Sequence, residues 1–195
     1  MNIVNYASDT FFAVVVGVPH ALVDCASHTG KTAIGVAATA LSVLTLGLVE
    51  PINDWADMTV NAIPILPRIY HAMTQIVNPG DSDPSTIRME DAFFTSKIAT
   101  PIFDIAMEAA SDEFFLNKHI ISRGAFVLGT LVAIVTRTAD LILGLIVAAI
   151  SIIPCFGRVE EINIFARNQL AFFGVIHDVC AGLRGLVNPQ QFLSE

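Results

Sequence analysis

The sequence predicts an all-α protein made of two pseudo-repeated helical units, joined by an acidic helical connector. Composition is the first observation: 54% of the 195 residues are hydrophobic and 14% are charged, whereas an average soluble domain has about 25% charged residues. The second observation is periodicity, because the apolar runs are long and show no strand-like alternation, and apolar residues near the C-terminus recur at steps of three and four. The third is that segments of the first half return in the second.

This internal repeat sets the expected organisation. The segment ASDTFF at 7–12 returns as ASDEFF at 110–115, and VEPIN at 49–53 returns as VEEIN at 159–163. The same register gives the pairs Gly35 and Gly144, Ser42 and Ser151, Trp55 and Phe165, and Ala56 and Ala166. We therefore expect three parts: helical unit 1 at 1–79, the acidic connector at 80–109, and helical unit 2 at 110–195.

Each unit is expected to contain an apolar hairpin, at 11–49 in unit 1 and at 125–157 in unit 2. In both, a short polar break separates two apolar stretches, DCASHTGK in the first and TRTAD in the second. Arg137 and Asp140 of the second break are three residues apart, a spacing at which they could pair on one helical turn. The second apolar stretch of each hairpin, at about 1.5 Å per residue, falls just short of a bilayer core of about 30 Å.

The remainder of each unit is predicted to be amphipathic, at 50–77 in unit 1 and at 159–187 in unit 2. In 159–187 the apolar residues form one helical stripe, and most charged residues fall on the other side. In 50–77, Pro64 and Pro67 should break the helix. The connector begins with the turn cluster PGDSDPST and continues as two acidic amphipathic helices interrupted by Pro101.

The segment CASHTGKT at 25–32 is close to the phosphate-binding pattern G-x-x-x-x-G-K-[ST]. Gly30, Lys31 and Thr32 fit the pattern. The first glycine is replaced by Cys25, which lacks the backbone freedom that a phosphate cradle needs. The repeat does not preserve the lysine in unit 2. We therefore expect no nucleotide binding here, and a turn between two helices instead.

The sequence contains no recognisable catalytic or metal-binding constellation, so we expect a protein that is not an enzyme and that has no cofactor and no metal. Its three cysteines are an odd number without metal-type spacing. His177 and Asp178 are sequence neighbours that point in different directions on a helix. The net charge of −8 argues against a nucleic-acid partner.

The repeated element V-E-x-I-N supplies candidate contacts to a protein partner, namely Glu50, Asn53, Glu160 and Asn163. The simplest interpretation is a helix N-terminus, where a carboxylate is favoured by the helix dipole. The alternative is a pair of symmetry-related polar contacts with a partner.

Two functional classes remain open. In the first, the protein is membrane-associated and non-enzymatic, and it binds, shapes or scaffolds at a membrane with its amphipathic helices at the interface. In the second, it is a soluble adaptor bundle for protein–protein interaction, whose apolar central helices are buried on all sides. The candidate membrane-contacting residues are Leu41, Val43, Leu44, Ile146, Val147, Ile150, Phe172 and Phe173.

Two apolar lobes around a short polar turn, at 11–49 and 125–157, resemble the bilobed hydrophobic hairpins of chlamydial inclusion-membrane proteins and related type III secreted membrane effectors. The phrases TLGLVEPIN and ADLILGL are also similar to segments of uncharacterised chlamydial proteins. The first lobe of each pair departs from the family pattern because it is too short to span a bilayer. The resemblance implies a secreted bacterial effector at a host-cell membrane, and it implies no catalytic residues.

Overall fold

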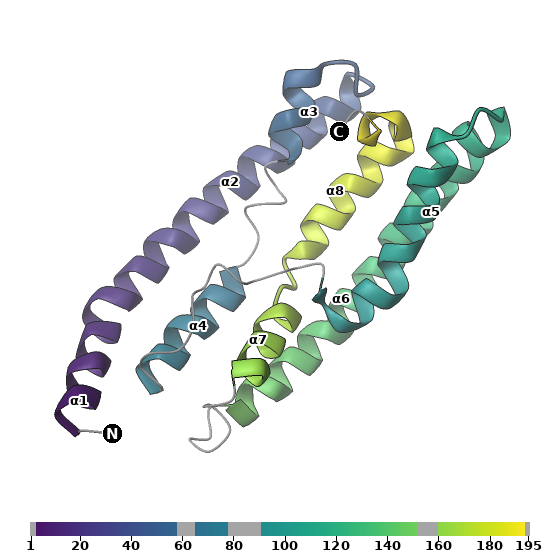
Figure 1. The fold of residues 1–195 in the computed structure, drawn as a ribbon. Coiled ribbons are helices and arrows are strands. Elements are labelled where there is room, and N and C mark those ends of the chain that lie inside the picture. The colour runs from purple at the N-terminus through teal and green to yellow at the C-terminus, as the bar shows by residue number, and fades with distance from the viewer. Residues whose placement is uncertain (1–2, 58–64, 78–90, 152–159, 194–195) are drawn as a thin grey trace.

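The computed structural model describes residues 3–57, 65–77, 91–151 and 160–193. Within these ranges the chain is helical and forms no strand, so the predicted all-α class is confirmed. The long helices lie side by side in one bundle (Figure 1).

In chain order, the helices are α1 (Ile3–Phe12), α2 (Val18–Leu44), α3 (Glu50–Asp57), α4 (Ile65–Val77), α5 (Thr100–Ser111), α6 (Ser122–Ser151), α7 (Glu160–Gln169) and α8 (Gly174–Val187). Short π-helical segments lead directly into three of them: η1 (Ala13–Gly17) into α2, η5 (Thr95–Ala99) into α5, and η6 (Asn117–Ile121) into α6. A 3-10 turn, η7 (Pro189–Phe192), follows α8.

The predicted apolar hairpins are wrong, because each polar break lies inside one continuous helix. The helix formed by α1, η1 and α2 runs through Lys31, and α6 runs through Arg137 and Asp140. The hydroxyls of Thr29 and Thr32 donate to carbonyl oxygens four residues earlier, which satisfies these polar side chains within the helix. The first break contains no proline and no glycine with positive φ, so nothing in it requires a turn.

The chain turns later than predicted within unit 1, after α2 ends at Leu44. Leu46 and Gly47 have φ values of 55° and 68°, in the left-handed region that favours glycine. The N–H of Gly47 donates to the carbonyl of Ser42 at 2.8 Å, which closes the end of the helix. The chain then enters α3 at Glu50.

The amphipathic segments also differ from expectation. In unit 2, the predicted single helix is two helices, α7 and α8, which meet at a bend of 47°. After this bend, α8 begins at Gly174. A Cβ atom at this position would lie 3.0 Å from Cζ of Arg137. In unit 1, α3 and α4 are separate helices as expected; Pro67 lies in the first turn of α4, and Pro64 lies outside the described residues.

The described part of the connector is one helix, where two were predicted. It continues through Pro101 because this proline occupies the start of α5 directly after the wider turns of η5, where a missing N–H is tolerated. The chain then turns at Asp112, whose carboxylate accepts from the N–H of Phe114 at 2.9 Å and from the amide of Asn117. The N–H of Phe114, followed by the Asn117 amide, lowers the pKa of Asp112 below its ordinary value.

Helix α8 lies in the middle of the bundle, against both α2 and α6 (Figure 1). Its glycines allow a close approach to α6. A Cβ atom at Gly182 would lie 1.7 Å from Oγ1 of Thr130, and one at Gly185 would lie 2.3 Å from the ring of Phe126. Larger residues at these positions would push the two helices apart.

The residues paired by the repeat fall on corresponding elements. Ser42 and Ser151 are both buried near the ends of the long helices α2 and α6, and Trp55 and Phe165 lie on the following helices α3 and α7. This placement is what a duplication requires, and the duplication itself stays a prediction.

Candidate functional site: a buried polar cluster

Polar side chains fill much of the interior of the bundle. The largest polar side chains that are less than 2% exposed are Arg167, Gln169, Asn163 and Asp140. Large apolar side chains are exposed instead, among them Leu44 at 78% and Val135 at 69%. Soluble proteins rarely bury charged and amide side chains while exposing so much aliphatic surface.

Helix α6 shows this reversal along its whole length. Its buried face carries mostly polar and small residues: Ser122, Phe126, Gly129, Ala133, Thr136, Arg137, Asp140, Gly144, Ala148 and Ser151. Its exposed large residues are all aliphatic: Val127, Leu128, Leu131, Ile134, Val135, Ile142, Leu145, Ile146 and Ile150. An amphipathic helix on the surface of a soluble protein has the opposite arrangement.

Asp140, in the middle of the α6 helix, caps the helix that contains α5. Its Oδ1 accepts from the N–H of Phe94 at 2.7 Å, and its Oδ2 accepts from the N–H and the hydroxyl of Thr95 at 3.0 and 2.7 Å. The side chain of Gln169 accepts from the preceding N–H, that of Phe93, at 2.8 Å. The first free N–H groups of the helix are thus satisfied by side chains of α6 and α7, and the carboxylate also faces the positive end of the helix dipole.

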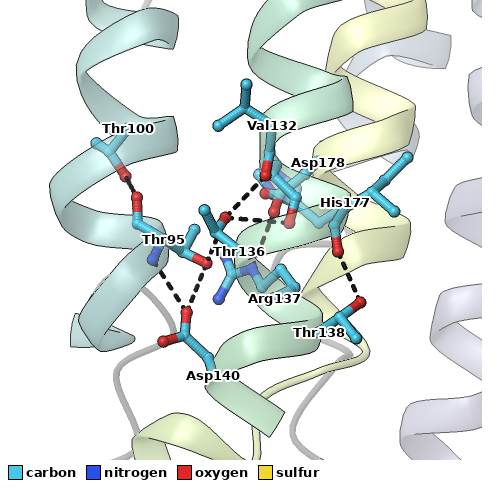
Figure 2. A network of polar contacts seen from close by, with 11 residues as sticks. Thr95, Thr100, Val132, Thr136, Arg137, Thr138, Asp140, His177 and Asp178 are labelled. Carbon is cyan, nitrogen blue, oxygen red and sulfur yellow. Dashed lines mark hydrogen bonds and ion pairs between the residues drawn. The ribbon is translucent and has the colours of Figure 1, made fainter. Parts of the chain in front are cut away.

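Arg137 pairs with α8. Its Nε donates to Oδ2 of Asp178 at 2.9 Å, and the two side chains are 6% and 9% exposed. Nδ1 of His177 lies 3.2 Å from the other carboxylate oxygen. Figure 2 shows Asp140 facing Thr95 on one side of α6, and Arg137 facing Asp178 on the other. The sequence suggested a pair between Arg137 and Asp140, but each of them has its partner on a different helix.

A second group of polar contacts ties α4 to α6 and α7. The hydroxyl of Tyr70 in α4 hydrogen-bonds to the hydroxyl of Ser151 and donates to Oδ1 of Asn163 at 2.9 Å. One turn after Asn163 on α7, the guanidinium of Arg167 lies 3.3 Å from Nδ1 of His71, the residue that follows Tyr70. This group connects unit 1 with unit 2.

The polar cluster therefore holds helices in register. Removing one partner of such a buried ion pair is costly, because the charge that remains is buried without water around it. Within the described ranges, no group of three or more His, Cys, Asp or Glu side chains is placed to hold a metal ion.

The predicted membrane-contacting residues divide by exposure. Leu41, Leu44, Ile146 and Ile150 are exposed, and Val43, Val147, Phe172 and Phe173 are half-buried. Val147 packs against the small apolar cluster of Tyr70, Ala148, Ala166 and Leu170.

The predicted partner contacts lie at helix starts. Glu50 and Glu160 are the first residues of α3 and α7, as the helix N-terminus interpretation requires, and Glu50 is exposed. The side chain of Glu160 lies outside the described residues. Asn53 accepts from the hydroxyl of Ser42 at 2.6 Å, and Asn163 is buried against Tyr70.

The segment 25–32 lies within α2, so its backbone N–H groups belong to a continuous helix and do not form a phosphate cradle. The side chain of Lys31 is exposed.

Sequence reasoning missed the partners of the cluster: Tyr70, Thr95, Arg167, Gln169 and Asp178. The available signal was the presence of Arg137 and Asp140 in the otherwise uncharged stretch 124–151, because a charge in such a segment needs a partner on a neighbouring element.

No family model, no curated protein and no solved structure matches this chain. Functional inference therefore rests on the arrangement of its own residues.

Proposed function

We propose that this protein is a non-enzymatic scaffold embedded in a membrane, with two spanning helices, of which the second is held to its neighbouring helices by the buried polar cluster. Two helices of the described chain, Ala7–Leu44 and Asn117–Ser151, are long and apolar enough to cross a bilayer. The observation that carries the proposal is the reversed polarity of α6, whose outer face is aliphatic and whose inner face is polar. Lipid solvates such an outer face, and small and polar residues hold membrane helices together.

The energetic argument favours lipid strongly over water. A Val or Leu side chain gains about 1.5–3 kcal/mol when it leaves water completely. Leu131, Val135, Leu145 and Ile146 are each more than half exposed on α6 alone. The described part of the α1–α2 helix adds Phe11 and further exposed aliphatic residues. In a monomer in water, these aliphatic side chains would stay exposed, and the free energy of their transfer out of water would not be gained.

The helices are longer than a bilayer core is thick. At about 1.5 Å per residue, spans of 38 and 35 residues reach about 57 and 52 Å, against about 30 Å of hydrocarbon. Each helix therefore extends beyond the core or tilts within it. Asp24 of α2 is paired with Arg68 of α4 at 2.7 Å, and the long side chain of Lys31 can reach toward the interface.

A soluble adaptor is the second candidate, and the exposed charges of α5 favour it. Asp104 and Glu108 point away from the bundle, as on a helix in water. In the membrane arrangement, this end of α5 and the turn at Asp112 belong outside the hydrocarbon core. Delivery to a host membrane by a secretion system would rest on the chlamydial resemblance alone.

The double substitution Leu41→Asp with Ile150→Asp separates the two candidates. Both positions are exposed, 51% and 43%, so in a soluble protein each change should alter stability by no more than about 0.5 kcal/mol. In a bilayer each aspartate costs up to about 2.5–3.5 kcal/mol, depending on its depth. We expect the wild type to stay in the membrane pellet after carbonate extraction, and the double variant to leave it.

The matched control is Leu41→Met with Ile150→Leu, which changes the same positions without adding charge and should remain in the pellet. A wild-type protein that is soluble without detergent and does not float with liposomes would reject the membrane proposal. The soluble adaptor would then replace it.

A further inference from the structure

We propose that an apolar groove between α2 and α8 holds one acyl chain of a membrane phospholipid, an inference that rests on the proposed membrane insertion. The groove has a volume of about 620 Å³. Its walls include Val36, Ala40 and Val43 from α2, and Ile176, Val179 and Leu183 from α8. This volume lies within the range of about 300–1,000 Å³ that is typical of ligand pockets.

The chemistry of the walls selects a hydrocarbon. No polar atom contributes to the accessible surface of the groove. A peptide backbone, a sugar or a lipid headgroup placed there would lose its hydrogen bonds to water without replacement, and each lost bond is costly. An acyl chain has no such bonds to lose.

The groove lies in the direction that an acyl chain takes in a leaflet. It follows α2 from Val36 to Leu44, which is about 12 Å at 1.5 Å per residue. Half of a hydrocarbon core of about 30 Å is about 15 Å, so the groove matches most of one leaflet. Helices α2 and α8 run side by side along the bundle (Figure 1), which aligns the groove with the helices that span the membrane.

The groove is also at the right depth. Gly174 of α8 lies against Arg137 of α6, and Gly182 lies against Thr130, so the stretch of α8 that lines the groove is level with 130–137 of α6. In that stretch, Leu131 and Val135 are exposed on the outer face of α6. The groove is therefore level with a surface that the proposed function assigns to lipid.

The rim of the groove is open to its surroundings. Val36, Leu44 and Leu183 are 42%, 78% and 47% exposed. An acyl chain can therefore enter sideways from the bilayer, and its headgroup can stay at the membrane surface.

Photolabelling tests this assignment. The purified full-length protein is reconstituted into phosphatidylcholine vesicles that contain a phosphatidylcholine with a diazirine at the end of one acyl chain, and labelled positions are mapped by mass spectrometry after illumination. We expect the groove-lining parts of α2 and α8 to be labelled more strongly than Leu131 and Val135, which report contact with bulk lipid. Ala40→Trp fills the groove and should lower its labelling severalfold, with labelling of α6 unchanged.

The matched control is Ala37→Trp, because Ala37 is exposed on the same helix and lies outside the groove lining. It should leave groove labelling as in the wild type. If Ala40→Trp loses helical circular dichroism, Val179→Phe fills the groove from the opposite wall and takes its place.

Each outcome decides between the two proposals. Labelling of α6 without preferential labelling of the groove, or groove labelling that neither filling variant lowers, would overturn the lipid site and leave the membrane proposal standing. No lipid labelling at any position would instead reject the membrane proposal.

Discussion

Replacing Arg137 with methionine removes the guanidinium from its pair with Asp178 and leaves a carboxylate buried between α6 and α8. The Nε atom lies 2.9 Å from the carboxylate, and both side chains are less than a tenth exposed. At that distance, with an effective dielectric constant of about 20, the attraction is about 6 kcal/mol. Removing one partner of a buried pair typically costs about 3–5 kcal/mol, because the other charge stays desolvated.

The same reasoning predicts that removing both charges is much milder. In Arg137→Met with Asp178→Leu, two apolar side chains of similar length meet between the same helices, a change that is often neutral or stabilising. We therefore expect each single variant to lower the melting temperature in detergent micelles by about 10 °C. The double variant should melt close to the wild type.

Thermal unfolding followed by far-ultraviolet circular dichroism measures all four proteins under one set of conditions. The interaction free energy of the cycle isolates the pair from other effects of each substitution. If both single variants melt within about 2 °C of the wild type, which corresponds to less than about 1 kcal/mol, the pair does not hold α8 against α6. A double variant as unstable as the sum of the singles would likewise refute the argument.

Further substitutions test other parts of the structure. Asp140→Ala leaves the first N–H groups of the α5 helix without their acceptor, so their hydrogen exchange should accelerate, whereas the exposed control Thr138→Ala should not change it. Gly182→Ala forces a Cβ to 1.7 Å from a side-chain oxygen and should lower the free energy of unfolding by about 1–3 kcal/mol. A Cβ atom at Gly30 would meet open space, so Gly30→Ala should raise the free energy of unfolding by up to about 1 kcal/mol. If Gly182→Ala and Gly30→Ala changed that free energy equally, the close approach of α8 to α6 would be refuted. ATP or GTP should not raise the thermal stability of the wild type, and Lys31→Ala should therefore melt at the same temperature with and without nucleotide. A stabilisation by nucleotide that is present in the wild type and lost in Lys31→Ala would show that the segment binds phosphate.

Composition and periodicity were sufficient to predict the helical class and the apolar character of the helices, because both are local properties. They failed at the polar breaks. A lysine, a histidine and two threonines around Gly30 suggested a turn, yet threonine hydroxyls can bond within a helix, and long charged side chains can leave it for water or for a partner. The presence of polar residues in an apolar segment does not by itself end a helix.

The candidate site could be anticipated only in part. Arg137 and Asp140 were visible as the two charges in the apolar stretch 124–151, and the spacing of three residues suggested that they pair with each other. The actual partners, Asp178 and Thr95, are 41 and 45 residues away from them in the sequence. A single sequence carries no signal that links positions so distant. The bend between α7 and α8 was missed for the same reason, because the residue that leaves too little room for a side chain at Gly174 is Arg137, on another helix.

The central position of α8 has a consequence for the order of assembly. This helix follows α2 and α6 in the sequence, and it contacts both of them. While the chain is being synthesised, the inner face of α6, with Arg137, is complete long before Asp178 exists to neutralise it. The earlier helices must wait in an incompletely packed state, in which a chaperone or an insertion factor could act on them. Loss of α8 by truncation would accordingly remove the helix that contacts both α2 and α6, and a shortened chain should be degraded as a whole.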